Sequence, residues 1–251
     1  MDPATLLARH GLPTAGLKPV PDGTTAEIWR TDRHVLRIGA TIDHQRETRI
    51  ALGALAAGVH TATPVAHGAG YSIWERLPGR AASQVRTVPT PTWSALLADL
   101  ERLHASPPEP RTHDAPTTWR GTPALIDRTR AWAHWTEPER RVLRRALGSK
   151  RPLRHPAFVH GDAWADNVLV DNTAGYVGII DWGCARWAVL EEEAARLETP
   201  ALELALERWK PQLDLRLLYG LRLELLLTVA LQGRGSPRYA RLTLSAFEDQ
   251  P

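Results

Sequence analysis

Three oxygen-bearing side chains whose types suit phosphate chemistry lie in one short stretch of the chain, namely Asp162, Asn167 and Asp181. Asn167 directly precedes the apolar run Val168–Val170, and Asp181 directly follows the run Tyr176–Ile180. A carboxylate and an amide oxygen are hard ligands that Mg²⁺ prefers when it also keeps waters and binds nucleotide phosphates. Asp162 could accept a proton from a hydroxyl group that attacks phosphorus. The residue types therefore indicate phosphoryl transfer.

The two apolar runs must position these side chains. They flank the turn-forming residues Asp171, Asn172 and Gly175, which is the composition of a β-hairpin with a longer loop. An antiparallel pair returns the residue before its first strand and the residue after its second strand to the same end. We therefore expect Asn167 and Asp181 to lie close together. The alternative is that these polar residues merely cap a hairpin.

The letters around these residues point to a known family. His160–Asp162 reads His-Gly-Asp, Asn167 follows five positions after the aspartate, and Ile180–Trp182 reads Ile-Asp-Trp. The same Asp-to-Asn separation occurs in the catalytic loop of protein kinases, which is also followed by a metal-binding aspartate. With these letters the stretch resembles the aminoglycoside phosphotransferase family, which is related to choline and fructosamine kinases and shares their kinase-like fold.

The resemblance implies a role for each residue. Asp162 would be the catalytic base, His160 would help to hold the loop, and Asn167 and Asp181 would bind Mg²⁺. The family commonly has an aspartate some twelve positions after the last of these that bonds to the catalytic loop, and this sequence has Glu193 there. The longer side chain puts that support in doubt.

An earlier hairpin is predicted over Gly23–Arg30 and His34–Gly39. Its small-residue loop contains Thr24 and Thr25 and could lie over phosphates, although an ordinary turn is the alternative. In the family this hairpin covers the nucleotide, and a basic residue on its return strand faces the phosphates. That position falls on Arg37, where protein kinases have lysine. The alternative is a surface arginine on an edge strand.

The apolar spacing of Asp43–Ala57 predicts a helix. Glu47 precedes Ile50 by three positions and Ala51 by four, so it shares the apolar face. A buried carboxylate needs a cationic partner. Arg37 is the natural candidate, and we expect an ion pair between the two residues.

Two short strands, Pro64–Gly68 and one beginning at Tyr71, are predicted to lead to a break near Gly79. By the family resemblance, a strand of this kind ends in a hinge whose backbone groups bond the adenine of ATP. Glu75 and Leu77 are the residues that this implies as nucleotide contacts.

Composition limits the classes of function. The chain has 251 residues, 43% of them hydrophobic, so it can bury its own core. Cys184 is the only cysteine, which excludes an intramolecular disulfide, and residues 1–12 do not read as a signal peptide. The apolar segment Leu217–Leu231 contains Arg222 and Glu224, so no membrane span is expected and a cytoplasmic location is the simplest reading.

The charge and its distribution along the chain bear on the source of the protein and on its partners. The net charge is +3, and arginines greatly outnumber the three lysines, a usage typical of a GC-rich bacterial genome. The arginines are spread along the chain rather than clustered, which argues against a nucleic-acid partner in spite of ten tryptophans.

Helices are predicted over Ala124–His134 and Glu137–Leu147, and the chain after Asp181 reads as helical with breaks at Pro200, at Pro211 and over 233–237. The first part of this tail is acidic. It could form an acidic wall for a polycationic antibiotic, but a solvated helix whose glutamates pair with nearby arginines is the plainer interpretation. The acidic residues are Glu191, Glu192, Glu193, Glu198, Glu203 and Glu207.

These observations predict an α+β, two-lobed, protein-kinase-like fold. Residues 1–77 would form a small antiparallel nucleotide-binding lobe, and residues 78–251 a larger helical catalytic and acceptor-binding lobe. The expected reaction is Mg²⁺-dependent transfer of the ATP γ-phosphoryl group to a hydroxyl of a small molecule, first of all an antibiotic such as an aminoglycoside, which would confer antibiotic resistance. The alternatives are a housekeeping kinase for a sugar, amino alcohol or fructosamine, and a non-catalytic ATP-binding regulatory module.

Overall fold

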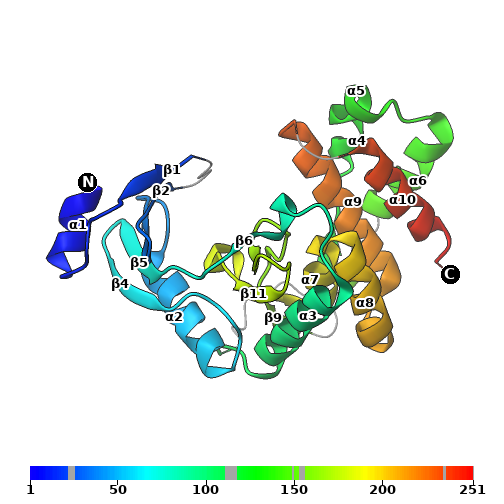
Figure 1. Cartoon of the computed structure of the whole chain (residues 1–251). Coiled ribbons are helices and arrows are strands. Elements are labelled where there is room, and N and C mark those ends of the chain that lie inside the picture. Colours follow the sequence, from blue (N-terminus) through cyan, green and yellow to red (C-terminus); the bar gives the residue numbers. More distant parts are fainter. Residues whose placement is uncertain (22–25, 111–117, 149, 153–155, 234–235, 251) are drawn as a thin grey trace. The chain divides into compact units, whose positions relative to one another are not determined.

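The structure is a computed structural model in which the chain forms two compact units (Figure 1). One unit is Met1–Pro110 with Asp162–Ala185, and the other is Arg111–Gly161 with Arg186–Pro251. These units are divided differently from the two lobes expected from the sequence, whose boundary after Leu77 stays a prediction. The structure describes residues 1–21, 26–110, 118–148, 150–152, 156–233 and 236–250.

The first unit contains an antiparallel five-stranded sheet in the order β1-β2-β3-β5-β4. The inner strand β5 is buried at four consecutive positions, as expected where both faces of a sheet are covered, whereas burial alternates along the edge strand β4. The predicted hairpin is present as β2 and β3, with Ile28 opposite Arg37. The strands are β1 (Lys18–Val20), β2 (Glu27–Arg30), β3 (His34–Ile38), β4 (Pro64–Gly68) and β5 (Tyr71–Glu75).

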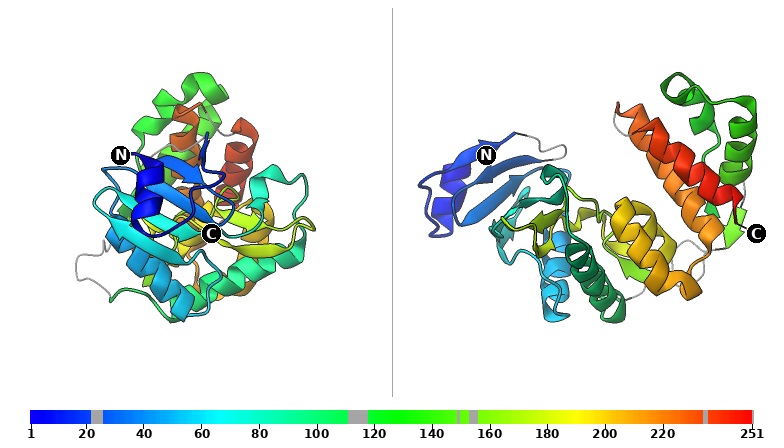
Figure 2. Two further views of the ribbon diagram at one scale, coloured as in Figure 1. Left: turned by 60° about the vertical axis from the view of Figure 1, so that its left-hand side comes forward. Right: turned by 45° about the vertical axis from the view of Figure 1, so that its right-hand side comes forward.

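The two faces of this sheet carry different side chains, because successive residues of a strand point to opposite sides. Leu36 and Ile73 are register partners on one face, where Leu6 and Leu7 of α1 (Pro3–Arg9) pack against them. Arg37 and its partner Ser72 lie on the other face, which contacts α2 (His44–Ala56) through side-chain hydrogen bonds. The two helices therefore cover opposite faces of the sheet (Figure 2).

Helix α2 forms where the sequence predicts it. Asp43 caps its first turn by accepting a hydrogen bond from the Arg46 amide at 2.9 Å, and Gly58 follows the helix with φ of +82°, a conformation that glycine adopts without strain. The apolar positions Ile50, Ala51 and Ala54 are fully buried. Because Glu47 lies on the same face, it is buried with them.

The second predicted hairpin is β10 (Val168–Val170) with β11 (Tyr176–Ile179). β6 (Arg80–Ala81) pairs with the other edge of β10. The next element after β6 is a 3₁₀ turn over Ala82–Gln84, and helix α3 (Thr90–Ala105) packs against β11.

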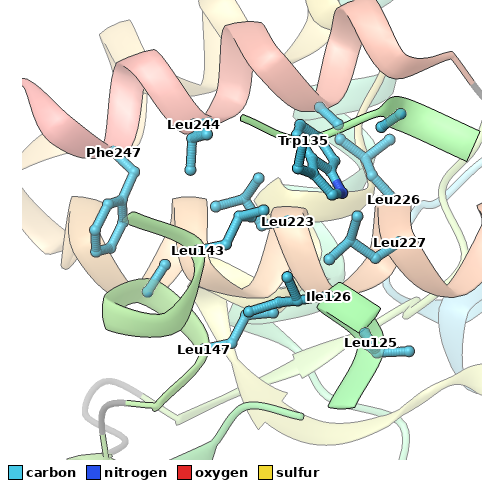
Figure 3. Packing of buried hydrophobic residues seen from close by; sticks show 13 residues of the cluster. Leu125, Ile126, Trp135, Leu143, Leu147, Leu223, Leu226, Leu227, Leu244 and Phe247 are labelled. Carbon is cyan, nitrogen blue, oxygen red and sulfur yellow. The ribbon is translucent and has the colours of Figure 1, made fainter. Parts of the chain in front are cut away.

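The second unit is mainly helical, and its core surrounds α9 (Leu215–Leu231) (Figure 3). Leu223 and Leu227 of α9 belong to one buried cluster with Leu143 of α6 (Glu137–Gly148) and Phe247 of α10 (Pro237–Glu248). The other elements are β7 (Thr118–Arg120), α4 (Ala124–Arg128), α5 (Arg130–Ala133), α6 (Glu137–Gly148), β8 (Lys150–Pro152), β9 (Pro156–Val159), β12 (Arg186–Val189), α7 (Leu190–Arg196), α8 (Thr199–Trp209), a 3₁₀ turn over Lys210–Gln212, and α10 (Pro237–Glu248).

Two sequence predictions for this unit were wrong. The single helix expected over 124–134 is divided into α4 and α5 at Thr129, whose φ of −98° and ψ of 7° depart from helical geometry. The Leu125 carbonyl accepts from both the amide and the hydroxyl of Thr129, at 2.9 and 2.7 Å. The segment after Asp181 is not entirely helical, because β12 pairs antiparallel with β9. This partner is distant in sequence, so periodicity within β12 alone could not reveal the pairing. The break predicted at Pro200 falls just before it, since α7 ends at Arg196 and α8 begins at Thr199, and α8 ends at Trp209 before Pro211. Of the last two helices, α9 ends at Leu231 and α10 begins at Pro237, on either side of the third predicted break.

Among the helices that the structure describes, none combines the length and the apolar character required to cross a membrane.

Stability should depend on pH through His44, which is buried between α2 and β5. Its Nδ1 lies 2.9 Å from the Ser72 hydroxyl, and its Nε2 lies 3.0 Å from the Gly39 carbonyl, so the neutral ring donates from Nε2 and accepts at Nδ1. The Ser72 hydroxyl in turn accepts from the Trp74 indole at 2.9 Å. Burial lowers the pKa of His44, and the positive charge of Arg37 lowers it further against the opposing effect of the Gly39 carbonyl.

Because the pKa of His44 is lower in the folded than in the unfolded chain, the stability that the neutral ring provides is complete above the ordinary pKa of about 6.5 and is lost as pH falls below it. Urea denaturation at a series of pH values should therefore show a free energy of unfolding that decreases between about pH 6.5 and more acidic pH. His44→Gln should flatten this part of the profile. An unchanged slope in the variant would contradict the assignment.

Candidate active site

The β10–β11 hairpin brings Asn167 and Asp181 to one end, as predicted. Val168 pairs with Ile179, and the Ile180 amide donates to the Asn167 carbonyl at 2.9 Å. This bond extends the ladder by one step beyond β10 and β11, so Asn167 lies beside Ile180, the residue that directly precedes Asp181. The position of both side chains is thus a consequence of antiparallel pairing.

Asn167 also holds Asp162. Its side-chain Nδ2 donates to the Asp162 carbonyl oxygen at 2.9 Å and to the Asp162 carboxylate Oδ2 at 2.8 Å. Both partners are acceptors, so the nitrogen of the amide must face them and the oxygen Oδ1 must face away. The turn between the two residues is closed by the Trp164 amide, which donates to the Asp162 carbonyl at 2.9 Å. Asp162 therefore has a fixed orientation before any substrate binds.

The predicted ion pair between Arg37 and Glu47 is confirmed. Arg37 Nη1 lies 2.7 Å from Glu47 Oε2, and both side chains are almost entirely buried. The other terminal nitrogen, Nη2, lies 3.4 Å from Asp181 Oδ1. Arg37 thus links helix α2 to the end of the β10–β11 hairpin and is not a surface arginine on an edge strand.

Burial raises the pKa of Glu47, and the negative charge of Asp181 raises it further, whereas Arg37 lowers it. The Glu47 carboxylate lies against Gly183 in the turn after Asp181. A Cβ atom at this position would lie only 2.7 Å from Glu47 Oε1. A larger residue at this position would therefore displace the Glu47 carboxylate from its present place.

Asp181 has an unusual backbone. Its φ of +69° and ψ of 80° lie in the left-handed region, which costs a residue with a Cβ about 1–3 kcal/mol. Its carboxylate accepts a hydrogen bond from the Gly183 amide at 3.4 Å, and its side chain is 41% exposed. Strain of this kind persists only where the surrounding contacts hold the residue in place.

The oxygens at this end of the hairpin fit a magnesium ion. Asn167 Oδ1 faces away from Asp162, and Asp181 supplies a partly exposed carboxylate. Mg²⁺ needs only one or two such protein oxygens, because waters and substrate phosphates complete its octahedral shell. Arg37 beside Asp181 adds a positive charge that suits a polyphosphate.

Glu193 supports the segment that precedes Asp162. Within the second unit, its carboxylate accepts from the His160 amide at 2.5 Å and from the Gly161 amide at 3.4 Å, and the side chains of His160 and Glu193 are fully buried. Gly161 has φ of +73°, which favours glycine. The doubt about the longer side chain is thus resolved, because glutamate reaches both amides.

The interpretation of the acidic tail as a solvated helix was wrong for part of α7. Glu191 and Glu193 are buried, and Glu191 accepts from the Asp214 amide at 2.8 Å. Because these two carboxylates are buried and accept from backbone amides, they do not line a solvent-facing acidic wall. Glu192, in contrast, is partly exposed and pairs with Arg186.

The remaining predicted contacts concern the nucleotide. Thr24 and Thr25 lie outside the described residues. The Glu75 amide donates to the Thr63 carbonyl at 2.8 Å within the sheet. Leu77 follows the end of β5, and its amide has no hydrogen-bond partner in the part of the chain that the structure describes.

Sequence reasoning missed Asp99 and Thr61. Asp99 is fully buried on α3 and accepts from the Tyr176 hydroxyl and the His60 amide, each at 2.8 Å. It lies three positions after Leu96 and four before Leu103, which is the same signal that identified Glu47. Thr61 accepts from the Trp182 indole at 2.9 Å, and no local pattern marks it.

Comparison with known proteins agrees with this geometry. The sequence model of the phosphotransferase enzyme family (APH) matches residues 16–216. The chain belongs to this family. It is therefore a phosphotransferase that acts on a hydroxyl group. A search of curated proteins finds no match.

Solved structures of the family share the fold over almost the whole chain. A macrolide 2′-phosphotransferase from Brachybacterium faecium has 17% identity and a TM-score of 0.63, with 99% of this chain and 98% of that chain covered. A candidate fructosamine-3-kinase from Thermobifida fusca has 17% identity and a TM-score of 0.61, with 99% of each chain covered. A thermostable mutant of the aminoglycoside phosphotransferase APH(4)-Ia, in a complex with ADP and hygromycin B, has 16% identity and a TM-score of 0.61, with 97% and 95% covered. These likenesses confirm the α+β kinase-like fold.

Replacing Glu193 by glutamine should destabilise this phosphotransferase by about 1–3 kcal/mol, because the amide offers one acceptor oxygen where two backbone amides now donate to a buried carboxylate. Glu192→Gln is the matched control on the same helix, since it removes an ion pair worth at most about 1 kcal/mol at a partly exposed site. Urea denaturation measures both. Equal effects of the two substitutions would contradict the support assigned to Glu193.

Proposed function

We propose that the chain transfers the γ-phosphoryl group of ATP to a hydroxyl group of an antibiotic such as an aminoglycoside, with Asp162 as the catalytic base. The observation that carries this proposal is the pair of hydrogen bonds from Asn167 to Asp162. They join the candidate base to a candidate metal ligand through a single side chain. The base and the phosphate site are thereby held in one geometry before substrates bind.

The reaction follows from these positions. Asn167 holds one oxygen of the Asp162 carboxylate and so fixes the rotation of the side chain. The carboxyl group of Asp162 accepts the proton of the acceptor hydroxyl while the hydroxyl oxygen forms a bond to the γ-phosphorus. The bond from that phosphorus to the β–γ bridging oxygen breaks, and ADP leaves with the electron pair. His160 contributes by holding the loop, since its buried amide is fixed by Glu193.

The phosphates would be bound by the groups at the end of the hairpin that face away from Asp162. Asn167 Oδ1 and the Asp181 carboxylate would hold Mg²⁺, which neutralises charge on the phosphates when it is bound. Arg37 would contact the α- and β-phosphates, and Glu47 keeps its guanidinium directed toward Asp181. Arginine offers a planar donor pair to phosphate where a lysine offers a point charge.

The adenine would be bonded by the backbone after β5. The Glu75 amide is already used in the sheet, so Glu75 can offer only its carbonyl, whereas the Leu77 amide can donate. Thr24 and Thr25 complete the proposed nucleotide contacts, over the phosphates. ATP as the co-substrate is supported by APH(4)-Ia, which was solved in complexes with ADP and with AMP-PNP.

The antibiotic acceptor is supported by the macrolide 2′-phosphotransferase and by APH(4)-Ia with hygromycin B among the similar structures. A second candidate, a small-metabolite kinase, is favoured by the equally complete match to the candidate fructosamine-3-kinase and by a choline/ethanolamine kinase family protein at 18% identity. The burial of Glu191 and Glu193 removes part of the charge argument for a polycationic acceptor.

Asp162→Asn should reduce turnover by about 10²–10⁴-fold, because the amide cannot accept the proton, while ATP binding is retained. Asp166→Asn is the matched control, since Asp166 is an exposed aspartate of the same loop that accepts a hydrogen bond from Ser83. Steady-state ADP release measures turnover, and calorimetry measures ATP binding. Full turnover in Asp162→Asn would exclude its role as base.

The acceptor is identified by Mg²⁺-dependent ADP release across aminoglycosides, macrolides, amino alcohols, sugars and fructosamines. Stimulation by one antibiotic class, lost in Asp162→Asn, is the expected result. Stimulation only by a metabolite class would favour the second candidate. ATP binding with no turnover on any acceptor would favour a regulatory module instead.

A further inference from the structure

We propose that the two residues His60 and Thr61 act as a positioning clamp for Asp181, and that Asp99 holds this clamp in place. The inference rests on the proposed function of Asp181 as a metal ligand and adds the residues that keep it in a strained conformation. All of them lie within the first unit.

The clamp contacts the chain on both sides of Asp181. The His60 carbonyl accepts from the Ile179 amide at 2.9 Å, two residues before Asp181. The Thr61 hydroxyl accepts from the Trp182 indole at 2.9 Å, one residue after it. Thr61 and Trp182 are both buried. His60 and Thr61 therefore hold Ile179 and Trp182, and the strained Asp181 lies between these two residues.

The structure makes room for this contact. A Cβ atom at Gly178 would lie 2.6 Å from the His60 carbonyl oxygen, so only glycine lets the clamp lie against β11. Gly58, with φ of +82°, turns the chain out of α2 just before the clamp begins.

Asp99 is the anchor of the clamp. Its fully buried carboxylate accepts from the His60 amide at 2.8 Å and lies 3.1 Å from His60 Nδ1. The Tyr176 hydroxyl donates to the same carboxylate at 2.8 Å, and Arg102 pairs with it from the surface. One carboxylate on α3 thus holds both the clamp and the first residue of β11, the strand that leads to Asp181.

These contacts explain how a residue with a Cβ keeps a left-handed backbone. The Ile180 amide is bonded to Asn167, the Ile179 amide to His60, and the Trp182 indole to Thr61. Strain relaxes wherever a neighbouring bond is released. Loss of the Thr61 hydroxyl should therefore let Asp181 move toward an ordinary backbone conformation and weaken its hold on the metal, although Thr61 itself touches neither metal nor substrate.

Thr61→Val is the test, because valine keeps the shape of threonine and removes the acceptor for Trp182. Thr61→Ser keeps the hydroxyl and is the rescue variant. Thr92→Val is the matched control, since Thr92 is an equally buried threonine whose hydroxyl bonds the same hairpin at its opposite end, to the Ala174 carbonyl at 2.6 Å.

The first readout is binding of ADP with and without Mg²⁺, measured by calorimetry. Thr61→Val should weaken ADP binding in saturating Mg²⁺ by about tenfold, as expected for loss of one buried hydrogen bond, and leave metal-free binding unchanged. Thr61→Ser and Thr92→Val should bind as the parent does. If Mg²⁺ increases the affinity for ADP by the same factor in Thr61→Val and in Thr92→Val, the proposal is overturned.

The second readout is hydrogen exchange of the metal-free protein, which does not depend on catalysis. Thr61→Val should increase exchange at Ile179–Gly183, whereas Thr92→Val should increase it near Ala174. If Thr61→Val does not fold, Trp182→Phe removes the same bond from the donor side and should give the same local change. Exchange that rises evenly over the hairpin in either variant would mean a general loss of stability and would overturn the clamp.

Asp181→Asn separates this proposal from the proposed function. If this substitution leaves the effect of Mg²⁺ on ADP binding intact, the assignment of Asp181 as a metal ligand fails. Local exchange at Ile179–Gly183 in Thr61→Val would still support the clamp in that case.

Discussion

The antiparallel pairing of β10 with β11 is the constraint on which the rest of the site depends. It places Asn167 and Asp181 at one end of a hairpin through backbone hydrogen bonds alone. The side chains then add two further links, from Asn167 to Asp162 and from Asp181 to Arg37. Asp162, Asn167, Asp181 and Arg37 are thus linked to one another at one end of the hairpin, which is the kind of preorganisation that the proposed reaction requires.

This phosphotransferase buries several carboxylates, and they differ in the groups that compensate their charge. Glu47 is buried against a cation, and the balance of burial and neighbouring charges raises its pKa in spite of Arg37. Glu193 is buried against two backbone amides, which can donate to a carboxylate without carrying a formal charge. Asp99 combines the two kinds of compensation, since it accepts from the His60 amide and also pairs with Arg102. In each case the carboxylate joins segments that are distant in sequence, so its burial contributes geometry to the site as well as packing.

The sequence predicted more of the site than of the surrounding helices. The hairpin, helix α2 and the pairing of Arg37 with Glu47 could be predicted because each is set by local period or by the chemistry of a buried charge. The division of α4 from α5 and the strand β12 could not. The first depends on the backbone conformation of one residue, Thr129, and the second on a partner, β9, that lies far away in the chain. The specific acceptor stays a prediction.

What the sequence determined by itself is therefore the chemistry and its framework, since residue type fixes which side chains can accept a proton or bind a cation, and period fixes which residues share a face. The tertiary structure decided which of these side chains are held, and by what. The burial of Glu191 and Glu193, the contact of Thr61 with Trp182 and the strained backbone of Asp181 all depend on segments that meet only in the folded chain. Such contacts leave no local pattern, because nothing in the neighbouring residues records which distant segment will pack against them.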